Sequence, residues 1–344
     1  MEKDKRTELG QLGEFGLIDL LKKNVKIQNS STLLGIGDDA AVIDTGNFYT
    51  LVTTDMLLEN VHFDLSYVPL VHLGYKAVAV NISDIAAMNG FPKQITVSIG
   101  LSNRFSVEAV EALYEGIRYA CENYGVDLVG GDTTSSVTGL LISITAIGEV
   151  KKGSLSLRSG ARINDIICVT GDLGGAFMGL QVLEREKHVF KDNPEMQPQL
   201  KGYDYIVQRQ LKPEARMDII HELADLNVVP TSMIDISDGL ASELFHICKN
   251  SGVGAMIYED KLPIDKATFD SAVEFNIDPN TAALNGGEDY ELLFTIGQED
   301  FEKIKNHKDI TTIGYITNKE YAAHMVTQGG NKIPLKAQGW NHFC

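Results

Sequence analysis

One pattern recurs along this sequence and limits what the chain can fold into: an acidic residue follows an apolar run. The clearest example is residues 81–90, in which Ser83 and Asp84 follow the small apolar run 77–80. A similar segment, residues 235–241, comes 154 positions later. Further acidic residues in such positions, three of them beside glycine, are Asp38, Asp39, Asp55, Asp132, Glu288 and Asp289. We expect these segments to converge on one site that binds several hard cations and a polyphosphate.

The chemistry of these residues suits divalent metal ions and phosphate groups. Mg²⁺ takes oxygen ligands, usually carboxylates together with water and substrate phosphates. Two carboxylates about 4 Å apart repel each other by about 4 kcal/mol in a protein-like dielectric, so a cluster of them stays ionised only when cations are present. The acidic residues predicted to form this cluster are Asp39, Asp55, Asp84, Asp132, Asp235 and Asp238, and the hydroxyls of Thr53, Thr54, Ser83 and Ser237 add neutral oxygens. Each acidic residue taken alone could instead be a helix cap or a turn residue.

The charge of the chain excludes some classes of partner. Its formal net charge is -17 and its isoelectric point is about 4.9, whereas nucleic-acid binding needs a basic face. A phosphorylated small molecule remains a suitable ligand, provided that metal ions bridge the two sets of negative charge. No apolar run approaches the roughly 20 residues that span a bilayer, and the charged residues 1–8 lack the apolar core of a signal peptide. The sequence therefore predicts a cytoplasmic protein without nucleic-acid or membrane partners.

Two domains of the α/β class are expected, because a chain of 344 residues is too long for one ordinary core. The best boundary is the polar segment 151–153, which predicts domains at 1–151 and 152–344. The repeated Ile-Ser-Asp motif suggests a diverged duplication, as do two segments of two glycines and an acidic residue that lie 156 positions apart. Matches this short also arise by chance.

Periodicity and turn residues predict the main elements. The best helix lies between Ser106 as its N-cap and Gly125 after its last turn, and further helices are expected over 73–88 and 213–226. Expected strands are 49–53, 95–101, 126–129, 140–150, 166–170, 292–296 and 311–317, the last one of the chain. Residues 187–213 are polar and contain three prolines, which predicts a long irregular connection that acts as a lid or as a linker.

Taken together, these motifs resemble the thiamine-monophosphate kinase family, of the superfamily that includes aminoimidazole ribonucleotide synthetase and selenophosphate synthetase. The likeness runs nearly from end to end. Its motifs lie at residues 13–15, 35–41, 53–55, 60–63, 81–84, 130–134, 158–160, 235–239, 287–291 and 339–343. A minor departure is Asn89, which stands where the family often has glycine after Ala-Met.

The resemblance implies an enzyme that phosphorylates thiamine monophosphate to thiamine diphosphate with ATP, by direct in-line transfer, as the last step of thiamine diphosphate synthesis. By this likeness, several Mg²⁺ ions would be held by Asp39, Thr53, Thr54, Asp55, Asp84, Asp132, Asp235 and Asp238. Asp84, Asp132 and Asp238 would be the catalytic residues among them. ATP would contact Tyr114, Gly131, Asp132, Arg158 and Ser237, and thiamine monophosphate would contact His62, Glu288 and Trp340.

The resemblance also implies a fold and an assembly. An N-terminal α/β domain would bind ATP and metal and pair its sheet with that of a second copy in a homodimer, and an α/β domain would follow. Two other functions fit part of the pattern. A sister synthetase with another phosphate acceptor would share the fold, although residues 286–291 and 339–343 favour thiamine monophosphate. A non-catalytic Ca²⁺ or nucleotide sensor would bind ligand without ATP turnover, but the chain has no EF-hand loop.

Overall fold

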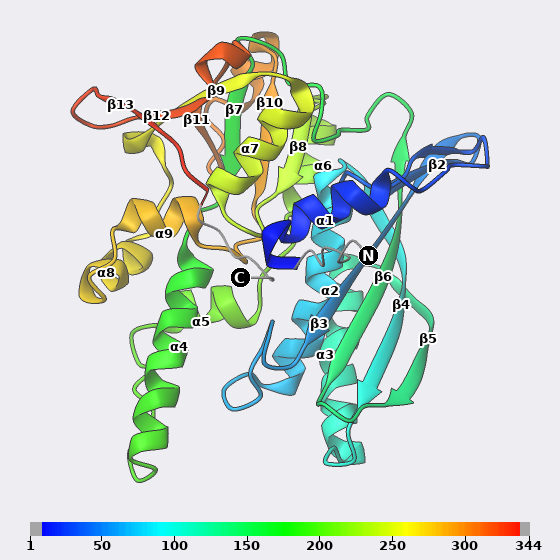
Figure 1. The fold of residues 1–344 in the computed structure, drawn as a ribbon, viewed down its shortest axis with the longest axis vertical. Helices are drawn as coiled ribbons and strands as arrows, with labels where there is room; N and C mark the ends of the chain where they lie inside the picture. Colours follow the sequence, from blue (N-terminus) through cyan, green and yellow to red (C-terminus); the bar gives the residue numbers. More distant parts are fainter. Residues whose placement is uncertain (1–8, 338–344) are drawn as a thin grey trace, which may run out of the picture.

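The computed structural model describes residues 9–337, and its strands form two sheets, one from each half of the chain (Figure 1). The first sheet has six strands in the order β1-β2-β3-β6-β4-β5. Their bounds are β1 Thr32–Leu34, β2 Ala41–Asp44, β3 Phe48–Leu58, β4 Phe91–Leu101, β5 Asp127–Ser135 and β6 Leu141–Lys151. Neighbouring strands are antiparallel except for the parallel pair of β4 and β5.

Helices α2 (Leu70–Ala87) and α3 (Val107–Tyr124) pack against each other and cover one face of this sheet (Figure 1). α2 is buried along most of its length, in line with its apolar sequence. At the start of α3, the Ser106 hydroxyl accepts a hydrogen bond from the Ala109 N–H, and Gly125 ends the helix with φ 64°. On the opposite face of the sheet, the outward residues of β3, β6 and β4 are half-buried or exposed.

The second sheet has seven strands in the order β13-β12-β9-β11-β7-β10-β8. The strands are β7 Ile166–Thr170, β8 Ser232–Asp235, β9 Gly254–Tyr258, β10 Leu292–Ile296, β11 Ile310–Thr317, β12 Ala323–Val326 and β13 Lys332–Pro334. The helices around them are α4 Gly175–Asp192, α5 Asp204–Leu211, α6 Met217–Asp225, α7 Leu240–Ser251, α8 Lys266–Glu274, α9 Pro279–Asn285 and α10 Phe301–Ile304. One more helix, α1 (Gly13–Lys22), belongs to the first half of the chain.

The main hydrophobic core spans both halves. One cluster joins Leu51 and Ile82 of the first half to Ile219 and Phe294 of the second, and another cluster, which includes Ile257, is confined to the second half. Each sheet uses strands from only one side of residue 151, but the division into domains at that residue stays a prediction. Among the described residues 9–337, no helix has the length and hydropathy needed to cross a membrane.

Several predicted elements differ from the observed ones, mostly in where they end. β3 continues to Leu58 because β6 pairs with it along its full length, so Asp55 lies within a strand. β5 continues through the two glycines and Asp132 to Ser135, paired with β4. The segment 187–213 is largely helical, since α4 reaches Asp192 and α5 begins at Asp204. Strands β12 and β13 follow the strand that was expected to be the last.

The two Ile-Ser-Asp motifs do not occupy equivalent structure. Asp84 lies inside α2, whereas Asp238 lies in the turn between β8 and α7. The segments are nevertheless neighbours in space, because the Ser83 hydroxyl donates a hydrogen bond to Asp235.

Candidate active site

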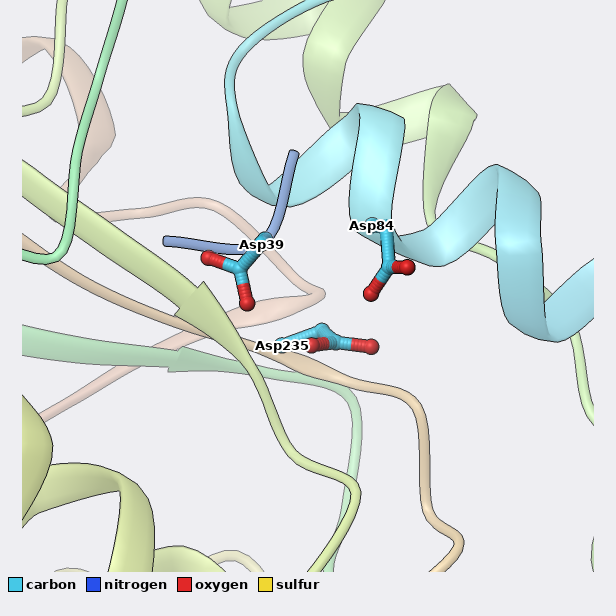
Figure 2. Close-up of side chains that lie close together, drawn as sticks. All are labelled: Asp39, Asp84 and Asp235. Carbon is cyan, nitrogen blue, oxygen red and sulfur yellow. The ribbon is translucent and has the colours of Figure 1, made fainter. Parts of the chain in front are cut away.

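Three carboxylates from distant parts of the chain converge (Figure 2). Asp39 lies in the turn before β2, Asp84 in the last turn of α2, and Asp235 at the end of β8. One oxygen of each carboxylate lies within 4.8 Å of the corresponding oxygens of the other two. In Figure 2 the three side chains point toward a common space between the helix and the strand. The structure thus brings together three of the predicted metal ligands.

Two hydroxyl groups fix the orientation of this carboxylate cluster, formed by Asp39, Asp84 and Asp235. Thr53 Oγ1 donates a hydrogen bond to Asp84 Oδ2 at 2.5 Å. Ser83 Oγ donates to Asp235 Oδ2 at 2.6 Å, and this bond also joins α2 to the second sheet.

Asp55 lies beside the carboxylate cluster, on the same strand as Thr53 and two residues further on, so both side chains face α2. The Asp55 N–H donates to Asn81 Oδ1 on α2 at 3.0 Å. Thr54, between them, faces the other side of the sheet, where its hydroxyl donates to the Ile144 carbonyl oxygen at 3.0 Å.

Burial and mutual repulsion raise the pKa values of these acidic groups. Burial and the charge of Asp39 raise the pKa of Asp55 to about 6 and that of Asp235 to about 7. Burial, followed by the charges of Asp55, Asp235 and Asp39, raises the pKa of Asp84 well above its ordinary value. The Asp39 Oδ2 atom is also buried and has no hydrogen-bond partner within residues 9–337. A cation in this space would relieve the repulsion and supply the missing partner, so the donor set fits a hard metal ion.

Arg158 and the turn after β8 close the site on one side. The Nη2 and Nε atoms of Arg158 donate to Asp39 Oδ1 at 2.5 and 3.2 Å. Ser237 and Asp238 line the same cavity, and the Asp238 N–H donates to Glu243 Oε1 at 3.0 Å. Because Glu243 is buried in the first turn of α7, this bond fixes the turn that carries both predicted residues.

The carboxylate cluster opens into a cavity of about 1320 Å³ between the two halves of the chain. Its lining includes the predicted residues Asp39, Thr53, Thr54, Asp55, His62, Asp84, Arg158, Asp235, Ser237, Asp238 and Glu288. Side chains of α1 and α7 also line it, and the rings of Phe15 and His246 from these helices lie 4.3 Å apart. A cavity of this size can hold two small ligands side by side.

His62 and Glu288, the predicted acceptor contacts, both line this cavity. His62 Nδ1 accepts a hydrogen bond from the Leu58 N–H at 3.0 Å. The Glu288 carboxylate lies 2.9 Å from Lys76 Nζ and accepts a hydrogen bond from Gln210 Nε2 at 2.6 Å.

Two predicted residues on β5, Asp132 and Gly131, lie away from the cavity. Strand pairing places Asp132 opposite Ser98, Ser143 and Met56 in turn, which puts it three strands, about 14 Å, from β3. Its neighbour Gly131 has a local reason to be glycine, because a Cβ there would lie 1.8 Å from the Val97 carbonyl oxygen.

Two further residues were predicted to contact the substrates, Tyr114 and Trp340. Tyr114 packs on the main hydrophobic core from α3 and is not part of the cavity lining. Trp340 lies outside the described residues. The roles assigned to these residues stay predictions.

Three residues that the sequence did not single out complete the surroundings of the site, namely Lys76, Gln210 and Glu243. Lys76 had a signal, since it is the one charged residue in the otherwise apolar first half of α2, and a cation is rarely buried without a partner. Glu243 had a weaker signal in its position near the start of a helix that follows an acidic turn. Gln210 had none, because its partner Glu288 is 78 residues away.

Comparison with known proteins relates this site to a family. Residues 37–150 match the family model described as AIR synthase related protein, N-terminal domain. The thiamine-monophosphate kinase of Bacillus subtilis (strain 168) is 37% identical over 345 residues, which cover 96% of this chain and 100% of that protein. The thiamine-monophosphate kinase of Aquifex aeolicus (strain VF5) is 36% identical, over 97% of this chain and 99% of that protein.

Comparison with solved structures points to the same family. The structure of AaThiL complexed with AMPPCP and TMP matches with a TM-score of 0.84 and 34% identity, over 99% of this chain and 100% of that chain. The two-sheet α/β fold expected from the resemblance is confirmed. The chain belongs to the thiamine-monophosphate kinase family, a family of enzymes.

Proposed function

We propose that this chain transfers the terminal phosphoryl group of ATP directly to thiamine monophosphate, giving thiamine diphosphate and ADP with the help of several Mg²⁺ ions. The observation that carries the proposal is the convergence of Asp39, Asp84 and Asp235 beside a cavity large enough for both substrates. Family membership and the ligands named for AaThiL support the choice of substrates. Since ATP is a co-substrate, we place the reaction in the cytoplasm, as the last step of thiamine diphosphate synthesis.

The residues that would hold Mg²⁺ are Asp39, Asp84 and Asp235, with Asp55, Asp238 and Thr53 around them. Thr54 could contribute only its backbone, because its side chain faces the other side of the sheet. When bound, Mg²⁺ neutralises phosphate charge and so lowers the barrier to phosphoryl transfer. Thr53 and Ser83 keep two of the carboxylates oriented before any ligand arrives. If these carboxylates held Mg²⁺, none of them would serve as a nucleophile, and an oxygen of the acceptor phosphate would attack the terminal phosphorus of ATP directly, with ADP as the leaving group.

On the ATP side, the proposal gives Arg158 and Ser237 contacts to the nucleotide. Arg158 is held by Asp39, and an arginine beside a metal site can pair with phosphate oxygens through its remaining N–H groups. On the acceptor side, it gives His62, Glu288 and Trp340 contacts to thiamine monophosphate. An aromatic ring suits a cationic thiazolium, and a carboxylate can accept N–H groups of the acceptor.

We further propose a homodimer in which β5 and the uncovered face of the six-stranded sheet meet a second copy. All nine residues of β5 are exposed, and the edge strand includes the apolar Val129, which is 57% exposed. Unpaired edges of this kind invite pairing with another chain. In such a dimer, Gly131 and Asp132 would reach the site of the partner, which would reconcile their predicted roles with their distance from the cluster of the same chain.

The dimer is tested by Val129→Arg, with Val107→Arg at another highly exposed position as the matched control. We expect light scattering to give a dimer for the wild type and the control and a monomer for Val129→Arg, together with loss of turnover. A fully active monomer would refute the role of the second copy.

The function itself is tested by incubating the purified protein with MgATP, with and without thiamine monophosphate, and measuring ADP, free phosphate and thiamine diphosphate. We expect ADP and thiamine diphosphate in equal amounts with little free phosphate. ADP and phosphate without thiamine diphosphate would indicate that the chain uses ATP but acts on another acceptor, as a sister synthetase does. Absence of ATP turnover would favour a sensor instead.

A further inference from the structure

Glu288 is held from behind by two groups that the proposed function does not use. Lys76 Nζ lies 2.9 Å from Glu288 Oε1, and Gln210 Nε2 donates to Glu288 Oε2 at 2.6 Å. Lys76 also donates to the Gln210 carbonyl oxygen at 3.2 Å. The Lys76 side chain is only 4% exposed, whereas that of Glu288 is 27% exposed and lines the cavity. Each carboxylate oxygen therefore has a fixed partner behind it and a lone pair left for a ligand.

The backbone that carries Glu288 is also fixed. Glu288 and Tyr290 have φ angles of 65° and 52°, a left-handed conformation that non-glycine residues adopt only when their surroundings enforce it. The Glu288 and Tyr290 N–H groups donate to the Ser237 and Ile236 carbonyl oxygens at 2.7 and 2.9 Å. The carboxylate of Asp289, between them, accepts from the Gly174 N–H at 2.7 Å. Glu288 therefore cannot turn to meet a ligand, and the ligand must fit its direction.

Lys76 lies in the first half of α2 and Asp84 in its last turn. They lie eight residues apart on α2, which corresponds to about 12 Å along its axis. Val80, between them, lines the cavity. Because we place the reacting phosphate beside Asp84 and Glu288 pairs with Lys76 about two helical turns away, the part of the acceptor that meets Glu288 is a group other than that phosphate.

The chemistry of this end indicates the group it binds. A buried Lys76 facing a partly exposed Glu288 adds little to stability compared with apolar residues of similar size, so the pair needs another explanation. A carboxylate with fixed direction and a lone pair available on each oxygen suits the N–H donors of an amino group on a flat ring. We infer that Lys76 and Gln210 are positioning residues that aim Glu288 at the amino-substituted heterocycle of the acceptor. This inference rests on the proposed function and adds its recognition element.

The test is Lys76→Met, which keeps the length of the side chain and removes its charge, with Lys93→Met at an exposed position of β4 as the control. We expect KM for thiamine monophosphate to rise about 10-fold, a change of about 1.4 kcal/mol, with KM for ATP unchanged. Calorimetry with thiamine, which has no phosphate, should show the same loss of affinity. Lys76→Arg should recover part of it.

Gln210→Met gives a second variant that leaves both charges in place, so it keeps the inference testable if Lys76→Met folds poorly. We expect the same pattern with a smaller rise in KM for the acceptor. Equal rises in KM for ATP and for the acceptor, or a lower melting temperature with unchanged thiamine affinity, would make Lys76 and Gln210 purely structural and overturn the inference.

A double-mutant cycle separates the inference from the function on which it rests. If Lys76 acts through Glu288, Lys76→Met combined with Glu288→Gln should raise acceptor KM no more than Glu288→Gln alone. If the double variant instead raised acceptor KM by the product of the two single effects, the inference would be overturned, and Glu288 would remain an acceptor contact. If Glu288→Gln has no effect, the assigned contact of Glu288 fails. A wild-type protein that turns over no acceptor refutes the proposed function instead.

Discussion

Asp84 is a residue whose place in the site could be predicted from the sequence. Its apolar context marked it in the sequence, and in the structure it is surrounded by Asp39, Asp235 and the hydroxyl of Thr53. Lys76 on the same helix was not selected: a charged residue in an apolar stretch signals that it has a partner, but it does not identify one that lies 212 residues later in the chain. Residue type thus predicts a functional site where several residues of the same type recur along the sequence. It does not predict a contact between two single residues that lie far apart in the sequence.

The central position of Asp84 predicts its importance for turnover. We expect Asp84→Asn to lower kcat at least about 100-fold, because the site loses one of three clustered charges that hold cations beside the phosphates. Steady-state kinetics with saturating MgATP measure this, and Asp192→Asn, at the exposed end of α4, is the control. A kcat near that of the wild type would rule out a shared metal site at Asp84.

His246 predicts how stability depends on pH. Burial, with smaller effects of the Arg158 and Lys249 charges, lowers the pKa of His246 to about 4. The unfolded chain, with an ordinary pKa near 6.5, therefore binds the proton first, so this contribution to stability is present above pH 6.5 and is lost as the pH falls toward 4. We expect it to remove about 2 kcal/mol between pH 7 and pH 5.

Urea unfolding at the two pH values measures this effect in the wild type, in His246→Phe and in the control His188→Phe on α4. The loss should shrink in His246→Phe only. The same loss in all three proteins would assign it to other groups.

At the scale of elements, local signals predicted helices better than strands. The ends of α3 follow from Ser106 and Gly125 alone, because capping is a contact between residues close in sequence. The ends of β3 and β5 depend on β6 and β4, which pair with them along their length. The local sequence of a strand does not show how far its partner strand extends. The segment 187–213 was misjudged since its prolines at 194 and 198 interrupt only a short stretch between two helices.

β5 offers a test of why a glycine is present. A Cβ at Gly131 would lie 1.8 Å from the Val97 carbonyl oxygen, whereas one at Gly130 would meet nothing within 4 Å. We expect Gly131→Ala to destabilise the fold by about 1–3 kcal/mol and Gly130→Ala to be nearly neutral, as measured by thermal unfolding. If Gly131→Ala unfolds like the wild type but binds ATP weakly, the glycine serves the nucleotide rather than the packing of β5 on β4.

At the scale of the whole molecule, the sequence predicted a convergence but not its geometry. Asp39, Asp84 and Asp235 meet because α2 packs against β8 of the other half, whereas Asp132 lies on the far edge of the first sheet. The two Ile-Ser-Asp motifs looked like copies of one unit and proved to be a helix and a turn in contact with each other. Such outcomes follow from topology, which short motifs do not encode.

Cation binding should therefore stabilise the molecule as a whole. Because the clustered carboxylates belong to both halves, we expect Mg²⁺ to raise the melting temperature of the wild type by mass action. Asp84→Asn should lose most of this increase. Sodium chloride at equal ionic strength controls for screening of surface charge, and an equal rise with sodium would contradict binding at the cluster.

The split origin of the carboxylate cluster has a consequence for the protein while it is being made. Asp39 and Asp84 belong to the first quarter of the chain, but Asp235, and Arg158 that pairs with Asp39, are added later. A ribosome that has produced the complete six-stranded sheet has still not produced the third carboxylate. Nascent chains, and truncated chains that end before residue 235, therefore lack a complete carboxylate cluster.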